Sequence, residues 1–151
     1  MKELSNSAIG GYSNFPDGPD VLAIVVRNIP TGVTTFKITA SGSSSYTINE
    51  ALDRPLTLYR GQTYTFEVNA SGHPFHIQTQ SGAYSQAALY TTGVTNPGQE
   101  NGTITFTVPL SAPDTLYYVC QYHSAMAGTI TVLDAPTANV NLNLFWSEAQ
   151  A

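Results

Sequence analysis

YYVCQYHSAMAGTITV, residues 117–132, is the stretch that decides both the predicted fold and the predicted site. Leu116, Tyr118 and Cys120, the only cysteine of the chain, occupy alternate positions, as in a strand with one buried face. His123 and Met126 follow within six residues, and a second alternating run begins after Gly128. The stretch therefore predicts two neighbouring strands joined by a tight loop that carries a thiol, an imidazole and a thioether.

Alternating segments of the same kind recur along most of the chain. Tyr64, Phe66 and Val68 alternate with polar residues, and Gly, Pro and Asn residues separate such segments from one another. The predicted strands lie near residues 21–27, 36–39, 46–49, 56–58, 64–68, 73–77, 104–108, 116–120 and 130–132. The long connection 81–102 contains one predicted helical turn, at 86–90. This pattern predicts an all-β fold, an antiparallel sandwich or barrel.

The composition argues against several functional classes. The chain has 151 residues, which favours one domain, and 10% charged residues, against about 25% in an average globular domain. Five Lys and Arg side chains and a net charge of -5 argue against nucleic acid as a partner, because phosphate binding requires clustered cations. The longest apolar run, Val21–Val26, is far too short to span a membrane, and the polar N-terminus contains no apolar core of a secretory signal. We therefore expect neither a nucleic-acid partner nor a membrane.

Two polar extensions flank the alternating segments. Residues 1–20 are rich in Gly, Ser, Asn and Pro without a period, and we interpret them as an extended N-terminal arm. Residues 21–133 then form the predicted sandwich. Residues 134–151 form a C-terminal extension, in which Val140 and Leu142 belong to an alternating segment compatible with one more strand.

The loop after Cys120 predicts a metal site. A thiolate, an imidazole and a thioether, from Cys120, His123 and Met126, can converge on one soft ion. This combination suits copper, which such sites hold in a trigonal plane of two imidazoles and one thiolate with a weak, long axial thioether. A second imidazole must then come from elsewhere in the chain.

His73 and His76, in the segment SGHPFHI, are the other two histidines. Strand alternation distinguishes them, since His73 shares its side with the apolar Phe75 and Ile77, whereas His76 shares its side with Gln78. We therefore predict His73 as the second imidazole ligand and His76 as a surface residue. The predicted metal ligands are His73, Cys120, His123 and Met126.

These motifs resemble those of the cupredoxins, the small blue copper proteins. The spacing C-x-x-H-x-x-M is similar to the short ligand loop of amicyanin, and plastocyanin shares the C-x-x-H part. The resemblance covers about residues 56–133 and implies an eight-stranded Greek-key β-sandwich with one type 1 copper ion at one end, loaded or left empty. His73, Cys120, His123 and Met126 match the four copper ligands of the family.

A longer part of the sequence resembles cupredoxin-like modules from marine and cyanobacterial genomes and from the phages that infect these hosts. The matching text is GHPFHIQT, YTTGVTN and GTITFTVPLSAPDTLYYVCQYHSAMAGTI. Two positions depart from the usual cupredoxin pattern. Pro74 follows His73 where Asn or Ser is common and helps to tie the ligand loops together, so the hydrogen bonds around the ligands are in question. Tyr122 stands where Pro is frequent, which changes the stiffness of the loop.

Other interpretations of the same residues are less favoured. A lone buried Cys is usually a small hydrophobic residue, and zinc accepts Cys and His but takes no thioether, so Met126 favours copper. Nucleophilic catalysis by Cys120 with His123 lacks evident oxyanion donors and an orienting carboxylate, and we expect no enzyme and no catalytic residue. The three tyrosines of the quoted stretch are interpreted as packing residues rather than a redox relay.

Two functional roles fit these features. The first, which we prefer from the sequence, is a structural component of a phage particle, a capsid decoration or tail protein whose arms dock on neighbouring subunits. It rests on the missing export signal, the lysine-poor composition rich in Thr, Asn and Gln, and the two extensions. Such a protein would belong to the virion and assemble in the host cytoplasm.

The alternative role is a soluble blue copper carrier that transfers one electron at a time. Pro74, Ala125 and Ala127 would then surround His123 with a small apolar patch that receives transient redox partners. Such carriers normally work outside the cytoplasm, so this role implies the periplasm or the extracellular space and a signal that was removed.

Overall fold

The computed structural model describes residues 24–27 and 32–140, with side chains described from 32 to 136. The strands are β1 (Ile24–Arg27), β2 (Thr35–Ser41), β3 (Ser45–Ile48), β4 (Ala51–Leu52), β5 (Leu56–Tyr59), β6 (Thr63–Asn69), β7 (Phe75–Gln78), β8 (Val94–Thr95), β9 (Asn101–Thr107), β10 (Thr115–Cys120), β11 (Ala127–Leu133) and β12 (Thr137–Val140). One 3₁₀ turn, η1 (Gln86–Ala88), follows β7. Over these residues, no helix has the length and apolar character needed to cross a membrane.

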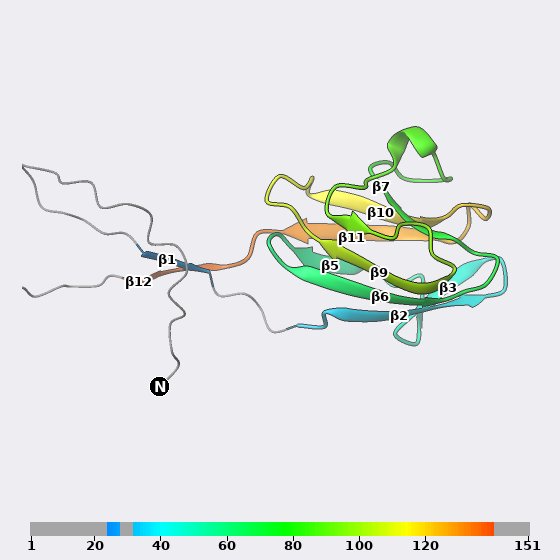
Figure 1. Ribbon diagram of the computed structural model, residues 1–151, viewed down its shortest axis with the longest axis horizontal. Coiled ribbons are helices and arrows are strands. Elements are labelled where there is room, and N and C mark those ends of the chain that lie inside the picture. Colours follow the sequence, from blue (N-terminus) through cyan, green and yellow to red (C-terminus); the bar gives the residue numbers. More distant parts are fainter. Residues whose placement is uncertain (1–23, 28–31, 141–151) are drawn as a thin grey trace, which may run out of the picture. The chain divides into compact units, whose positions relative to one another are not determined.

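The larger of the two compact units of the chain, Arg27–Ala138, contains a sandwich of two sheets, which Figure 1 shows stacked face to face. One sheet has four strands in the order β5-β11-β10-β7, and the other has six in the order β4-β3-β2-β6-β9-β8. Most neighbours are antiparallel, but β2 runs parallel to β6 and β5 runs parallel to β11. Because parallel neighbours cannot be joined by a hairpin, the chain crosses between the sheets, as in Greek-key folds. The predicted all-β sandwich is confirmed, and its sheets are mixed rather than purely antiparallel.

Alternating side chains build the core between the two sheets. In β6, Tyr64, Phe66 and Val68 are buried and the residues between them are wholly or partly exposed, as the sequence pattern predicts. Aromatic rings fill the centre, where the ring centroid of Phe75 lies 5.5 Å from that of Phe66 and 5.5 Å from that of Tyr118. Burial of such large apolar side chains contributes roughly 1.5–3 kcal/mol each to stability.

One end of the sandwich is closed by the guanidinium of Arg60, which lies in the turn after β5. Its Nε and Nη2 atoms donate hydrogen bonds of 3.0 and 2.7 Å to the carbonyl of Ala112, and the same guanidinium pairs with the carboxylates of Asp114 and Asp134. Only 9% of the Arg60 side chain is exposed, whereas both carboxylates lie largely in solvent. Strand β10 begins directly after Asp114 and ends at Cys120, at the opposite end of the sandwich.

The segments outside the sandwich differ in part from their prediction. The sequence predicts a sandwich strand over 21–27, whereas Ile24–Arg27 pairs with β12 in a separate two-stranded sheet. A continuous apolar run has no alternation, so it cannot indicate which sheet or partner a strand joins. The helical turn predicted at 86–90 is confirmed as η1. The proposed arm 1–20 and Leu142 lie outside the described residues, and the division into arm, sandwich and extension stays a prediction.

Candidate metal centre

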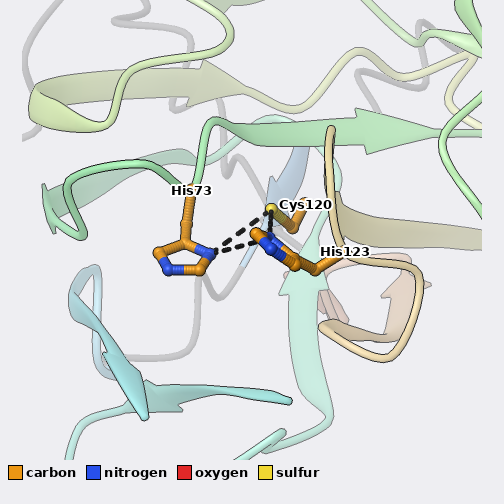
Figure 2. Close-up of side chains that lie close together, drawn as sticks. All are labelled: His73, Cys120 and His123. Carbon is orange, nitrogen blue, oxygen red and sulfur yellow. Dashed lines mark hydrogen bonds between the residues drawn. The ribbon is translucent and has the colours of Figure 1, made fainter. Parts of the chain in front are cut away.

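Three side chains meet at the end of the sandwich where β10 finishes, as Figure 2 shows. His73 lies in the turn before β7, Cys120 is the last residue of β10, and His123 lies in the loop between β10 and β11. The two imidazole Nδ1 atoms are 3.1 Å apart, and the Cys120 Sγ lies 3.5 Å from Nδ1 of His123 and 3.8 Å from Nδ1 of His73. The thiol is buried, and both imidazoles are half-buried.

Strand register brings the two distant chain segments together. Strands β7 and β10 are antiparallel neighbours, and Cys120 pairs with Phe75, two residues after His73. The turn that carries His73 depends on Gly72, whose φ of +82° lies in the left-handed region that favours glycine. The Gly72 N–H also donates to the carboxylate of Glu100 at 2.8 Å. Turn geometry and register thus fix the position of the first imidazole.

The loop after Cys120 folds back onto its own strand. The Cys120 N–H donates to the carbonyl of Met126 at 2.9 Å, and the Met126 N–H donates to the carbonyl of His123 at 3.0 Å. The Gln121 N–H donates to the carbonyl of Pro74 at 3.1 Å, which ties this loop to the turn before β7. The backbone of Pro74 therefore supplies the link between the two ligand segments that its side chain cannot make.

The spacing of the three donor atoms fits a single metal ion. Typical bonds of about 2.0–2.1 Å to nitrogen and 2.3 Å to sulfur place neighbouring donors roughly 3.3–3.7 Å apart in tetrahedral to trigonal arrangements. The measured separations of 3.1, 3.5 and 3.8 Å bracket that range, and two imidazoles with one thiolate are the in-plane donors of a type 1 copper site. The His–Cys–His cluster fits the ligand loop of a blue copper protein and supports one type 1 copper ion.

Met126, the fourth predicted ligand, is fully buried at the end of the same loop. Its backbone is hydrogen-bonded to Cys120 and to His123, so the residue lies beside the cluster in the fold. Axial ligation by its thioether stays a prediction.

His76 is not the surface residue that alternation predicts, since only 9% of it is exposed. Its ring lies 5.0 Å from the ring of Tyr84, and a Cβ added at Gly98 would come within 2.6 Å of it. The connection that contains η1 runs over β7, which Figure 1 shows, and all four residues of that strand are buried. Alternation of apolar and polar residues along β7 cannot predict that this connection covers the strand, because the connection itself has no periodic pattern. Burial lowers the pKa of His76, although its Nε2 lies 3.3 Å from the Gln121 Oε1.

Tyr46 is a residue of the site that the sequence does not indicate. It is fully buried, and its hydroxyl donates a 2.8 Å hydrogen bond to the backbone carbonyl of His73. The only sequence signal is its place in the predicted strand 46–49, which predicts burial of an aromatic ring and not a contact with the metal centre.

The apolar patch predicted around His123 is smaller than expected. Ala125 is exposed and Ala127 is half-buried, but Pro74 is buried, because its carbonyl accepts a hydrogen bond from the ligand loop that lies against it. The exposed aromatic side chain of this loop is instead Tyr122, which is 62% exposed.

Among solved structures, the chain is similar to rusticyanin, a cupredoxin. Rusticyanin from Thiobacillus ferrooxidans is 19% identical, with 77% of this chain and 100% of that chain covered and a TM-score of 0.45. A methionine-to-glutamine variant of rusticyanin is 23% identical over 68% of this chain and 80% of that chain, with a TM-score of 0.45. Reduced rusticyanin is 22% identical over 71% of this chain and 88% of that chain, again with a TM-score of 0.45. No family model and no curated protein matches the chain.

Proposed function

We propose that this chain is a blue copper protein that carries single electrons, with copper held by His73, Cys120 and His123 and with Met126 as a weak fourth ligand. The observation that carries this proposal is the convergence of one sulfur and two nitrogen atoms, from two distant segments, at the spacing of metal ligands. Copper bound there would accept and return one electron by changing between Cu(II) and Cu(I).

The surroundings of the ligands suit electron transfer. The thiol of Cys120 is fully buried, so water and dissolved oxidants have little access to the sulfur, whereas the half-buried imidazoles of His73 and His123 reach toward the surface. Backbone hydrogen bonds hold both ligand segments in place before any metal binds. Such preorganisation limits the rearrangement that accompanies a change in the charge of the site.

An enzymatic role has less support. In the part of the chain that the structure describes, the cluster of His73, Cys120 and His123 includes no carboxylate. An imidazole that acted as a base for the thiol would therefore lack the group that usually orients it. Metal ligation is the chemistry that these three side chains can perform together, and transient redox proteins are the proposed partners.

The role in a phage particle and the location in a virion stay predictions. They rest on composition and on the two extensions, and residues 1–23 and 141–151 lie outside the described structure. A protein shortened to residues 19–135 distinguishes the two roles. An electron carrier should keep its spectrum and potential, whereas a particle component should lose its incorporation into particles. Particles that incorporate the shortened protein normally would contradict the particle role.

Copper titration tests the proposed function directly. The purified protein should bind one Cu(II) per chain and develop strong visible absorption from charge transfer between the Cys120 sulfur and copper. Cys120→Ser should abolish this band, and His73→Gln should weaken binding. His76→Gln is the matched control, since it changes the other histidine of the same segment and should keep both properties. A blue Cys120→Ser protein, or equal losses in both histidine variants, would show that the ligands are wrongly assigned.

A further inference from the structure

Tyr46 connects the six-stranded sheet to the metal centre. It lies on β3, whereas His73 precedes β7 and Cys120 ends β10, both in the four-stranded sheet. The Tyr46 side chain is fully buried and crosses the core, and its hydroxyl donates a 2.8 Å hydrogen bond to the backbone carbonyl of His73. This bond links the turn of the first imidazole to the sheet that carries no predicted ligand.

Two aromatic rings hold the Tyr46 ring in place. The ring centroid of Phe75 lies 5.2 Å away at an interplanar angle of 64°, and that of Tyr118 lies 6.2 Å away at 67°. Phe75 is two residues after His73, and Tyr118 is two residues before Cys120. The strands that carry the ligands therefore also clamp the ring, and its hydroxyl cannot leave the centre unless the core opens.

The acceptor of this bond belongs to the turn that carries the first imidazole. A phenol has one proton to donate, and the hydrogen bond assigns it to the carbonyl oxygen of His73. The Gly72 N–H of the same turn donates to the carboxylate of Glu100 at 2.8 Å, so two hydrogen bonds fix this turn.

We propose that Tyr46 is a positioning residue of the metal centre, whose hydroxyl fixes the His73 backbone beside Cys120. The inference rests on the proposed copper function. Hydrogen-bond partners outside the ligand set orient the ligands, and their loss typically costs 10–100-fold in metal affinity. Loss of the hydroxyl should therefore weaken copper binding.

Tyr46→Phe tests this inference, because it removes one oxygen atom and keeps the ring. Tyr118→Phe is the matched control, since Tyr118 is an equally buried tyrosine whose hydroxyl donates to the Arg54 carbonyl at 3.2 Å. In Tyr46→Phe we expect the copper affinity to fall about tenfold and the visible band of the copper-loaded protein to move. Tyr118→Phe should change neither. An unchanged copper affinity in Tyr46→Phe, or an equal loss in Tyr118→Phe, overturns the inference.

A copper-free measurement keeps this inference distinct from the proposed function. In the metal-free protein, Tyr46→Phe should speed amide hydrogen exchange at Gly72 and His73 severalfold, and Tyr118→Phe should not. A wild-type protein that binds no copper overturns the proposed function and the copper-affinity part of the inference, while faster exchange still supports the positioning part. Unchanged exchange in Tyr46→Phe overturns the positioning part.

Fluorotyrosine at position 46 covers the case in which Tyr46→Phe fails to fold. It keeps the ring and the hydroxyl, and the fluorine makes the hydroxyl a stronger hydrogen-bond donor. In the metal-free protein, amide hydrogen exchange at Gly72 and His73 should therefore slow rather than speed up. Exchange that stays unchanged or becomes faster overturns the inference.

Discussion

The two ends of the sandwich differ in how their buried polar groups are paired. At one end the guanidinium of Arg60 is satisfied within the protein, by the carbonyl of Ala112 and by two carboxylates. At the other end, within the described residues, one sulfur and two ring nitrogens from His73, Cys120 and His123 face one another. The first arrangement is complete in the protein alone, whereas the second has the form of a set of ligands that an ion completes.

This difference predicts which end serves stability and which serves function. The two ends are joined by β10, which begins after Asp114 and ends at Cys120, so a single strand connects the two sets of polar groups. We nevertheless expect stability to depend mainly on the Arg60 end and metal affinity mainly on the histidine end. Substitutions that move only one of these two properties test that separation.

His123→Ala should have the largest effect. Loss of a direct ligand should lower copper affinity by more than about a hundredfold, since loss of an outer hydrogen-bond partner alone costs 10–100-fold. The His123 imidazole is half-exposed, so the free energy of unfolding of the metal-free protein should change by less than about 1 kcal/mol. Competition with a copper chelator and urea unfolding measure the two quantities. If this variant bound copper as tightly as the wild type, the assignment of metal binding to this end of the sandwich would be wrong.

Arg60→Met should have the next largest effect, on stability alone. The buried carbonyl of Ala112 loses two donors, which should cost about 2 kcal/mol, and the solvent-exposed carboxylates add little. Urea unfolding of the metal-free protein measures the loss, and Arg54→Met, at an exposed arginine, is the matched control with a change under about 0.5 kcal/mol. A shift of the copper band in Arg60→Met would show that the two ends are coupled.

The pH dependence of stability should reveal the buried His76. Its pKa is lowered in the folded protein, so below the ordinary value of 6.5 the unfolded chain binds a proton that the folded protein does not. Stability is therefore present above that pH and is lost as the pH falls, by at most about 1.4 kcal/mol per pH unit. Urea unfolding of the metal-free protein at pH 7.5 and pH 5.5 should show a smaller loss for His76→Phe than for the wild type. Equal losses in both proteins would exclude His76 as the cause.

Met126→Leu should have the smallest effect on stability. The two side chains have similar volumes, so the free energy of unfolding should fall by less than about 1.5 kcal/mol. The reduction potential should rise, because a weak donor to Cu(II) is lost. Voltammetry of the copper-loaded variant measures this change. A potential equal to that of the wild type would mean that the thioether is not a ligand.

Much of the fold and most of the candidate site follow from local patterns. Burial of one sheet face imposes a period of two, so the alternation of Tyr64, Phe66 and Val68 locates β6 from the sequence alone. The spacing of Cys120 and His123 places both side chains on one short loop. Parity then selects His73, and the structure brings the three side chains together. Ligation by these residues stays a prediction, as does the thioether.

What the sequence could not indicate depends on contacts between distant segments. His76 is covered by a connection that has no periodic pattern, so alternation along β7 wrongly predicts an exposed side chain at this position. The partner of Ile24–Arg27 depends on strand pairing that an apolar run does not encode. The bond from Tyr46 to His73 crosses between two sheets, and its formation depends on how the sheets are stacked.

The parallel pairing of β5 with β11 also sets the order in which the protein can be made. Leu56 lies opposite Ile130, roughly seventy residues later, so the four-stranded sheet cannot assemble until synthesis has passed the ligand loop. Closing so long a stretch of chain is a late and slow step. On the ribosome, His73 therefore emerges well before the sulfur and the imidazole that it meets. An ion that all three side chains bind can therefore be captured only after the domain has been almost completely translated.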